Sequence, residues 1–363
     1  MLIPFLFTVK PGQFTGTGAR SSKPVYRIDK LNSNSFPFVT NNYDMETKVT
    51  VGIDISKSSF DVAIPCKNKE GYEHHKFSNN TEGFRKFCMR LEAQSNCIME
   101  ASGVYYLQLA IHLHQQGMRV SVVNPLTIKR FSQMRLMRTK TDKKDSAIIA
   151  EYGKVENPLQ WTPRAEHMLQ MQQLQAVQDN FTGQLIRLKN QQEAFVSSGI
   201  KNKFGSKILT KEIEHISKQI ELIDEELTKI TLEFHQDLFE RLKTIKGIGK
   251  RAAMTLILIT DGFTRFENSK QLCAYVGLSP RIFESGTSVK GKVKICKMGM
   301  ARMRKLLYLC AMSARTCNKA CKEMFERLTE RGKNGKLAII AIANKLLRQA
   351  FVIGTSQMKY KES

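Results

Sequence analysis

The hydrophobic and polar positions of residues 47–160 follow the pattern of a mixed α/β domain. The segments "KVTVGIDIS", "SSFDVAIPC" and "HHKFSNN" predict three strands in an antiparallel meander. The pattern then predicts a helix with Thr81 as N-cap, a strand at "NCIMEASG", a helix that ends at Gly117, a strand at "RVSVVNP", and a helix from about residue 142. Three antiparallel strands followed by parallel ones favour an RNase H-like fold over a Rossmann fold.

Residues 165–235 show a heptad pattern instead. A first helix carries apolar residues at this period, with Gln178 and Gln192 in its seam. The second seam alternates spacings of four and three and consists of Leu209, Ile213, Ile216, Ile220, Ile223, Leu227 and Ile230. Such a seam predicts a coiled coil. The pattern leaves open whether the helices form an antiparallel hairpin or pair with another protomer.

Residues 239–355 read as a compact, mainly helical and very basic domain. Its opening, "LKTIKGIGKRAAMTLILI", resembles the turn of a helix-hairpin-helix. There Gly247 and Gly249 would let backbone N–H groups approach a phosphate, with Lys250 following. The alternative is a plain turn between helices that happens to contain glycine.

The N-terminal segment, the apolar runs and the cysteines limit the class of protein. Residues 1–46 are rich in Gly, Ser, Thr, Asn and Pro without helical or strand period, which predicts a disordered leader, and Met45 is an alternative start. No apolar run of about 18 residues occurs, so we expect no transmembrane helix. The eight cysteines form no CxxC pair, which favours reduced thiols in a cytoplasmic protein.

The net charge of the chain is the composition feature that says most about its partners. The chain has 57 Lys and Arg against 33 Asp and Glu, which gives a formal charge of +24. A field of this size attracts polyanions, and nucleic acid is favoured over anionic membrane because the charges are clustered. One cluster spans residues 129–144, and its predicted backbone-binding members are Lys129, Arg130, Arg135, Arg138, Lys140, Lys143 and Lys144.

Carboxylates lie within and near that cluster. Asp54 is in the first predicted strand, Glu100 ends a later one, and Asp142 and Asp145 are three apart at the start of a predicted helix. If they converge, the four would repel one another unless a cation such as Mg²⁺ or Mn²⁺ joined them. Such ions clamp the attacking and leaving oxygens of a phosphodiester. The alternative is that the aspartate pair only complements the helix dipole.

A second basic segment, residues 278–314, contains no acidic residue within its cation cluster. No aromatic residue interleaves with these charges, so phosphate contact is the simpler use than base stacking. The predicted contacts are Lys290, Lys292, Lys294, Lys297, Arg302 and Arg304. Ser285 stands just before them, in "ESG". Taken alone, that tripeptide is more typical of a turn than of a nucleophile.

The segments "GIDISKSSFDVAI", "IMEASGVYY", "KTDKKDSAIIAEY", "IKGIGKRAAMTLI" and "LSPRIFESGTSVKGKVKICKMGM" together resemble the DEDD transposases of the insertion sequence 110 family. The resemblance covers about residues 48–355 and leaves residues 1–46 without a counterpart. It implies an N-terminal RNase H-like domain similar to Holliday-junction resolvases, a central coiled coil and a C-terminal helical transposase domain.

This resemblance also implies roles for single residues. The family's acidic tetrad falls on Asp54, Glu100, Asp142 and Asp145, and its nucleophilic serine falls on Ser285. It further implies Mg²⁺ or Mn²⁺, DNA, a non-coding bridge RNA, and a dimer or tetramer in which two protomers share an active site. Two rival functions remain open: a metal-dependent junction-resolving nuclease that uses water, and a non-catalytic nucleic-acid-binding scaffold.

Overall fold

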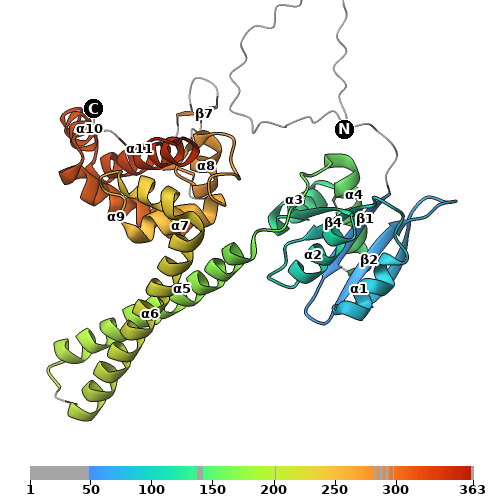
Figure 1. Cartoon of the computed structure of the whole chain (residues 1–363), viewed down its shortest axis with the longest axis horizontal. Helices are drawn as coiled ribbons and strands as arrows, with labels where there is room; N and C mark the ends of the chain where they lie inside the picture. The colour runs from blue at the N-terminus through green and yellow to red at the C-terminus, as the bar shows by residue number, and fades with distance from the viewer. Residues whose placement is uncertain are drawn as a thin grey trace, which may run out of the picture. The chain divides into compact units, whose positions relative to one another are not determined.

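A computed structural model describes residues 49–136, 142–200, 202–281, 284–285, 289–290, 294–296 and 298–360 (Figure 1). The predicted leader, residues 1–46, lies outside the described residues. The remainder contains an N-terminal α/β part and a helical part, and each is described by itself below.

The α/β part is built on one five-stranded sheet. Its strands are β1 (Thr50–Ile55), β2 (Ser59–Pro65), β3 (Tyr72–Ser78), β4 (Asn96–Glu100) and β5 (Arg119–Val123), in the order β3-β2-β1-β4-β5. The first three strands are antiparallel neighbours, whereas β4 and β5 run parallel to β1. The predicted meander followed by parallel strands is confirmed. Central strands β1 and β4 are almost entirely buried, which is why consecutive apolar residues occupy the middle of each strand.

Four helices pack on this sheet: α1 (Thr81–Cys88), α2 (Leu107–Gln115), α3 (Pro125–Met134) and α4 (Asp142–Glu156). The predicted cap of α1 is off by one residue, because the side chain of Asn80, not Thr81, accepts the N–H of Gly83 at 2.9 Å. Asn is among the best N-cap residues, and Thr81 becomes the first helical position. The predicted start of α4 at Asp142 is confirmed.

The heptad segments form an antiparallel helical hairpin within one chain. Helices α5 (Glu166–Ser197) and α6 (Lys203–Lys243) follow each other after a short loop and pack side by side (Figure 1). Leu209, Ile216, Leu227 and Ile230 are buried. The polar residues of the first seam find partners across the hairpin: Gln178 donates to Asp224 at 3.1 Å, and Gln192 donates to Thr210 at 3.1 Å.

The base of the hairpin shares one hydrophobic core with the C-terminal helices. These are α7 (Lys250–Thr260), α8 (Ser269–Val276), α9 (Ala301–Cys317), α10 (Lys319–Glu330) and α11 (Gly335–Thr355). Helix α7 is buried around most of its circumference, and Met168 and Leu227 of the hairpin join the same core. In the described part of the chain, α11 is the single helix long and apolar enough to cross a membrane, and half of it is buried in this core, as in a core helix of a globular domain.

Between α8 and α9 lie four two-residue strands, which we call the serine hairpin. They are β6 (Pro280–Arg281), β7 (Glu284–Ser285), β8 (Val289–Lys290) and β9 (Lys294–Ile295). Strand β6 pairs with β9, and β7 pairs with β8, both antiparallel. The N–H of Cys296 donates to the carbonyl of Ser279 at 2.9 Å and closes the base. Ser285 therefore lies on the inner pair of strands, nearer the tip than the base.

Candidate active site and nucleic-acid interface

Asp54 and Glu100 lie next to each other on one face of the sheet. In the parallel ladder Gly52 pairs with Ile98 and Ile53 with Met99, so Asp54 and Glu100 are the next neighbours. Side chains two apart on a strand share a face. Gly52 and Ile98 both face α4, because a Cβ on Gly52 would lie 2.0 Å from the carbonyl oxygen of Ser146, and one on Gly153 would lie 2.3 Å from Ile98. The two carboxylates therefore lie on the face that α4 covers.

The direction of α4 brings its aspartates to the same edge. Ser146 and Ala150 lie against Gly52, whereas Gly153 lies against Thr50, earlier in β1. The helix thus runs antiparallel to β1, and its N-terminus lies toward the carboxyl ends of β1 and β4. Asp145 precedes Ser146 and is half-buried. Asp142 is the first residue of α4, and its side chain is outside the described residues.

The glutamate is fixed by a local hydrogen bond. Ser102 Oγ donates to Glu100 Oε1 at 2.8 Å and so orients the carboxylate at the strand end. The next residues of the loop, Val104 and Tyr105, are exposed apolar side chains at the same edge. The sequence analysis did not single out Ser102, because this hydrogen bond has no sequence signature of its own.

The donor chemistry at this edge fits a hard divalent cation. Asp54, Glu100 and Asp145 offer carboxylate oxygens, which Mg²⁺ and Mn²⁺ prefer. Among the side chains that the structure describes, no three acidic, histidine or cysteine groups gather closely enough to hold a metal ion. The fourth predicted ligand, Asp142, is not among them.

Exposed cations flank this edge on α3, which begins directly after β5. Lys129 and Arg130 are exposed on α3. Arg135 at its end pairs with Glu151 of α4 at 2.8 Å and lies over Phe131. Arg138 and Lys140 lie outside the described residues.

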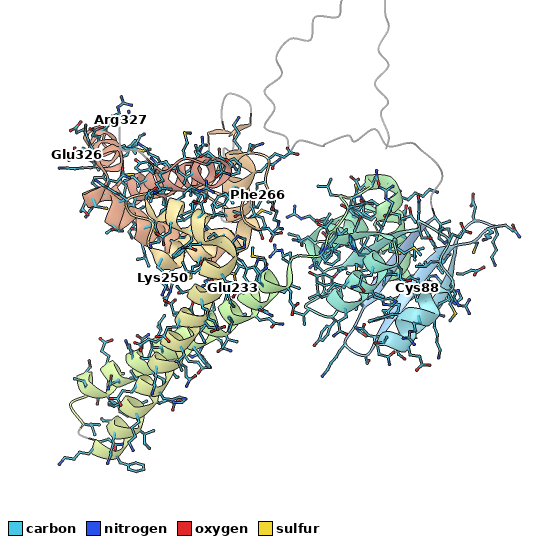
Figure 2. The ribbon with its side chains drawn as sticks, viewed as in Figure 1. Cys88, Glu233, Lys250, Phe266, Glu326 and Arg327 are labelled. Carbon is cyan, nitrogen blue, oxygen red and sulfur yellow. The ribbon has the colours of Figure 1, made fainter. Side chains whose placement is uncertain are left out.

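The two glycines of the turn before α7, Gly247 and Gly249, have different surroundings. Gly247 has a φ of 102°, and a Cβ there would lie 2.5 Å from the Cβ of Ala314, so this glycine serves packing against α9. Gly249 is the N-cap of α7 and faces open space. Lys250, which Figure 2 labels, lies 3.6 Å from Asp224 of the hairpin, and Arg251 lies 3.4 Å from the same carboxylate.

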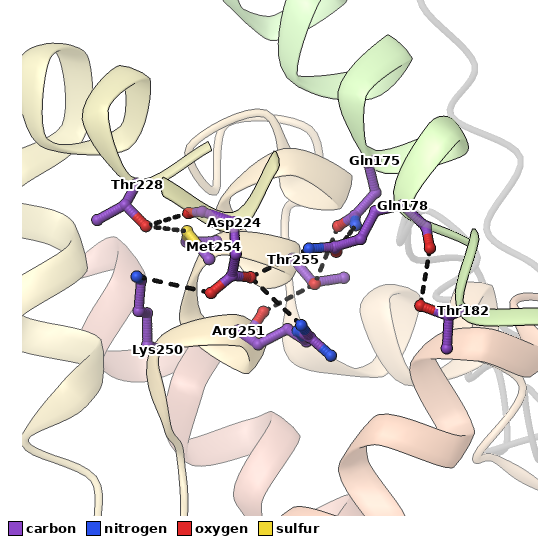
Figure 3. A network of polar contacts seen from close by, with 9 residues as sticks. All are labelled: Gln175, Gln178, Thr182, Asp224, Thr228, Lys250, Arg251, Met254 and Thr255. Carbon is purple, nitrogen blue, oxygen red and sulfur yellow. Dashed lines mark hydrogen bonds and ion pairs between the residues drawn. The ribbon is translucent and has the colours of Figure 1, made fainter. Parts of the chain in front are cut away.

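That carboxylate belongs to a polar network at the junction of α5, α6 and α7 (Figure 3). Gln175 donates to Gln178 at 2.8 Å, and Gln178 donates to Asp224 at 3.1 Å. Thr255 of α7 donates to Gln175 at 3.3 Å. The network satisfies amides that would otherwise be costly to bury, and it fixes the hairpin against α7.

The second basic cluster is also partly neutralised. Arg302 donates to Asp179 of α5 at 2.6 Å; burial lowers the pKa of Arg302 and raises the pKa of Asp179. Arg304 donates to the carbonyl of Val276 at 2.9 Å and so caps α8. Lys290 and Lys294 lie on β8 and β9, with side chains outside the described residues, as are Lys292 and Lys297 altogether. The sequence analysis did not predict the pairing of Arg302 with Asp179 or that of Lys250 with Asp224, because these aspartates lie far away along the chain.

Comparison with known proteins decides the family. One family pattern, described as transposase, matches residues 51–199, and a second, described as the transposase IS116/IS110/IS902 family, matches residues 239–326. The pilin gene-inverting protein of Moraxella lacunata is 30% identical over 319 residues, which cover 85% of this chain and 96% of the relative. The chain belongs to the IS110 family of transposases.

Other relatives agree with this assignment. The Moraxella bovis pilin gene-inverting protein is 30% identical over 317 residues, covering 85% of this chain and 96% of the relative. The transposase for insertion sequence element IS1328 of Yersinia enterocolitica is 27% identical over 348 residues, covering 86% of this chain and 98% of the relative. The two IS110-family matches contain the carboxylate edge in the first and the serine hairpin in the second.

Proposed function

We propose that this transposase cuts and rejoins DNA strands at the ends of a mobile element, in a cytoplasmic, nucleoid-associated setting. The observation that carries the proposal is the packing of α4 on β1 at Gly52, which directs the Asp142 and Asp145 end of the helix to the strand ends that bear Asp54 and Glu100. We infer that the sheet is an RNase H-like domain, because its strand order and mixed directions match that prediction.

In this proposal the four carboxylates hold Mg²⁺ or Mn²⁺. When bound, the ion supplies positive charge that draws in the phosphate oxygens of the scissile strand. The residues of the chain orient the site and bind DNA. Ser102 orients Glu100, and the exposed cations Lys129 and Arg130 bind the DNA backbone on either side of the scissile phosphate. Lys290, Lys292, Lys294 and Lys297 would do the same around the serine hairpin.

We propose Ser285 as the nucleophile. A bond from its Oγ to phosphorus forms as the bond from phosphorus to a sugar oxygen breaks, and the serine proton ends on that oxygen. One phosphodiester is thus exchanged for another, and the strand can be rejoined by the reverse reaction. The carboxylates and Ser285 belong to separate parts of the chain, and we infer that two protomers combine them within a dimer or tetramer.

The resemblance and the charge of +24 support a bridge RNA as a second polyanionic partner that selects donor and target DNA. In this view the protein binds backbones, and base pairing supplies the choice of sequence. Two relatives are named pilin gene-inverting proteins, and their names support DNA inversion, in addition to insertion, as a reaction of this chain.

Substituting Asp145 tests the carboxylate edge. Asp145→Asn removes the charge of a ligand at a half-buried position, so DNA cleavage in Mg²⁺ should fall by at least about a hundredfold, with folding and nucleic-acid binding retained. The matched control is Glu151→Gln, farther along the same helix, where the carboxylate pairs with Arg135. Full cleavage by Asp145→Asn, or equal loss in Glu151→Gln, would contradict the assignment.

A further inference from the structure

Three side chains, those of Arg265, Phe266 and Tyr275, form a cation–π cluster on the surface of the helical part. The guanidinium carbon of Arg265 lies 4.6 Å from the ring centre of Tyr275 and 5.7 Å from that of Phe266. The two rings are 5.2 Å apart, and Arg265 Nη1 donates to Tyr275 Oη at 3.1 Å. Arg265 is thereby held beside both rings, although it is an exposed residue.

The group is preorganised by its backbone. Arg265 and Phe266 follow a tight turn after α7, in which Asp261, Gly262 and Phe263 all have positive φ, and Tyr275 lies in α8. Phe263 is buried, and the N–H of Arg265 donates to the carbonyl of Thr260 at 3.1 Å. Phe266 packs one side against the hydrophobic core and remains half-exposed (labelled in Figure 2). A group held in this way loses little conformational freedom when a flat ligand stacks on it.

This group lies at the base of the serine hairpin. A Cβ on Gly299, just after the hairpin, would lie 2.2 Å from the carbonyl oxygen of Tyr275, and one on Gly277 would lie 2.4 Å from that of Met298. Ser285 is six residues beyond Ser279, where the base closes, so the two residues are at most about 22 Å apart. That reach equals about six stacked base pairs.

We propose that Arg265, Phe266 and Tyr275 form a stacking platform for an unpaired nucleobase close to the strand that Ser285 attacks. Arginine planes and aromatic rings are the surfaces on which proteins stack splayed-out bases. An exposed cation, Lys270 of α8, lies close in sequence and is suited to contact the phosphate of a nucleotide. The inference rests on the proposed function, since strand exchange exposes unpaired bases.

The test uses the full-length protein and two labelled DNAs of equal length: one fully paired, and one with an unpaired 2-aminopurine. Arg265→Ala and Tyr275→Ala should weaken binding to the unpaired DNA by about tenfold and reduce the change in 2-aminopurine fluorescence, while affinity for the paired DNA stays within about twofold. Arg265→Lys should behave like Arg265→Ala, because it keeps the charge but loses the planar group.

Arg315→Ala is the matched control, since Arg315 also lies over an aromatic ring, that of Phe325, at 5.0 Å, and is away from the platform in sequence. It should leave both affinities unchanged. If both Arg265 variants kept the affinity and the fluorescence change of the wild type, the platform would be wrong while the proposed function stood. An equal loss of affinity for paired and unpaired DNA would also contradict the platform. If the wild-type protein bound neither DNA, the proposed function would fail as well.

Discussion

Gly52 is a residue whose role is set by a neighbour and not by its own conformation. Its φ lies outside the positive region, yet a Cβ there would lie 2.0 Å from Ser146 O and 2.3 Å from Ala150 N. Gly52→Ala must push α4 away from β1, which we expect to destabilise the α/β part by about 3 kcal/mol. Thermal unfolding followed by circular dichroism measures this change.

A second glycine supplies the comparison for that variant. Gly183 lies within α5, and a Cβ there meets nothing within 4 Å. Gly183→Ala should therefore stabilise the protein, by about 0.5–1 kcal/mol, through helix propensity alone. If Gly52→Ala were as stable as the wild type, the close packing of Gly52 against Ser146 and Ala150 of α4 would be wrong.

His235 makes folding sensitive to pH. Its ring nitrogen lies 3.0 Å from that of His167, and it occupies the kink in α6, with φ −139°. Burial, and then His167, lower the pKa of His235, while Asp261 acts in the opposite direction. The unfolded chain therefore binds this proton more readily, so the stabilisation is complete above about pH 6.5 and is lost as pH falls through the folded pKa.

The pH dependence can be checked by thermal unfolding between pH 7.5 and pH 5. The wild-type protein should lose stability as pH falls, and His235→Gln should lose less over the same interval. His215→Gln, at an exposed position of α6, should follow the wild type. An unchanged slope in His235→Gln would show that another group titrates.

Among the elements, the helical hairpin of α5 and α6 can be tested by substitutions on its two faces. Ile216 is 4% exposed, whereas Leu222 on the same helix is 48% exposed. Ile216→Asp places a charge in the seam and should cost about 3 kcal/mol or more, while Leu222→Asp should change stability by about 0.5 kcal/mol at most.

Thermal unfolding and light scattering separate the two arrangements that the heptads left open. An intrachain hairpin predicts lower stability for Ile216→Asp at unchanged mass. A folded Ile216→Asp protein of smaller mass would show instead that the seam joins protomers.

Most elements could be predicted from the sequence, because their burial is periodic. The meander, the parallel strands and α4 follow from alternating and apolar runs. The cap of α1 was misplaced by one residue because Asn80 and Thr81 are both good caps, and only the backbone geometry distinguishes them. The hairpin could not be predicted, since a heptad seam is the same whether its partner is in the same chain or another.

The candidate site could be predicted only as a set of residue types. The sequence indicated Asp54, Glu100 and Asp145 as ligands, but not that Gly52 fixes the helix that carries Asp145. It also indicated Lys250 and Arg302 as nucleic-acid contacts, whereas Asp224 and Asp179 lie beside them. Pairs so distant along the chain leave no local pattern, so only the fold shows them.

For the whole molecule, the charge of +24 is not evenly available to a polyanion. Carboxylates of the hairpin pair with cations near the start of α7 and α9, while Lys129 and Arg130 of α3 are exposed. Binding to any nucleic acid should therefore depend on salt through exposed cations such as these more than through the paired ones. In the proposed function, the carboxylate edge and the serine hairpin act in a single strand-exchange reaction.

The most direct test of that claim is a denaturing gel of end-labelled element DNA, incubated with Mg²⁺ and the transposase, with and without the proposed bridge RNA. The wild-type protein should leave a protein–DNA adduct that survives denaturation, and Ser285→Ala should leave none while still binding DNA. Asp145→Asn should also leave none. If Ser285→Ala still cut the DNA and released free phosphate ends, water would be the attacking group and the protein would be a metal-dependent nuclease.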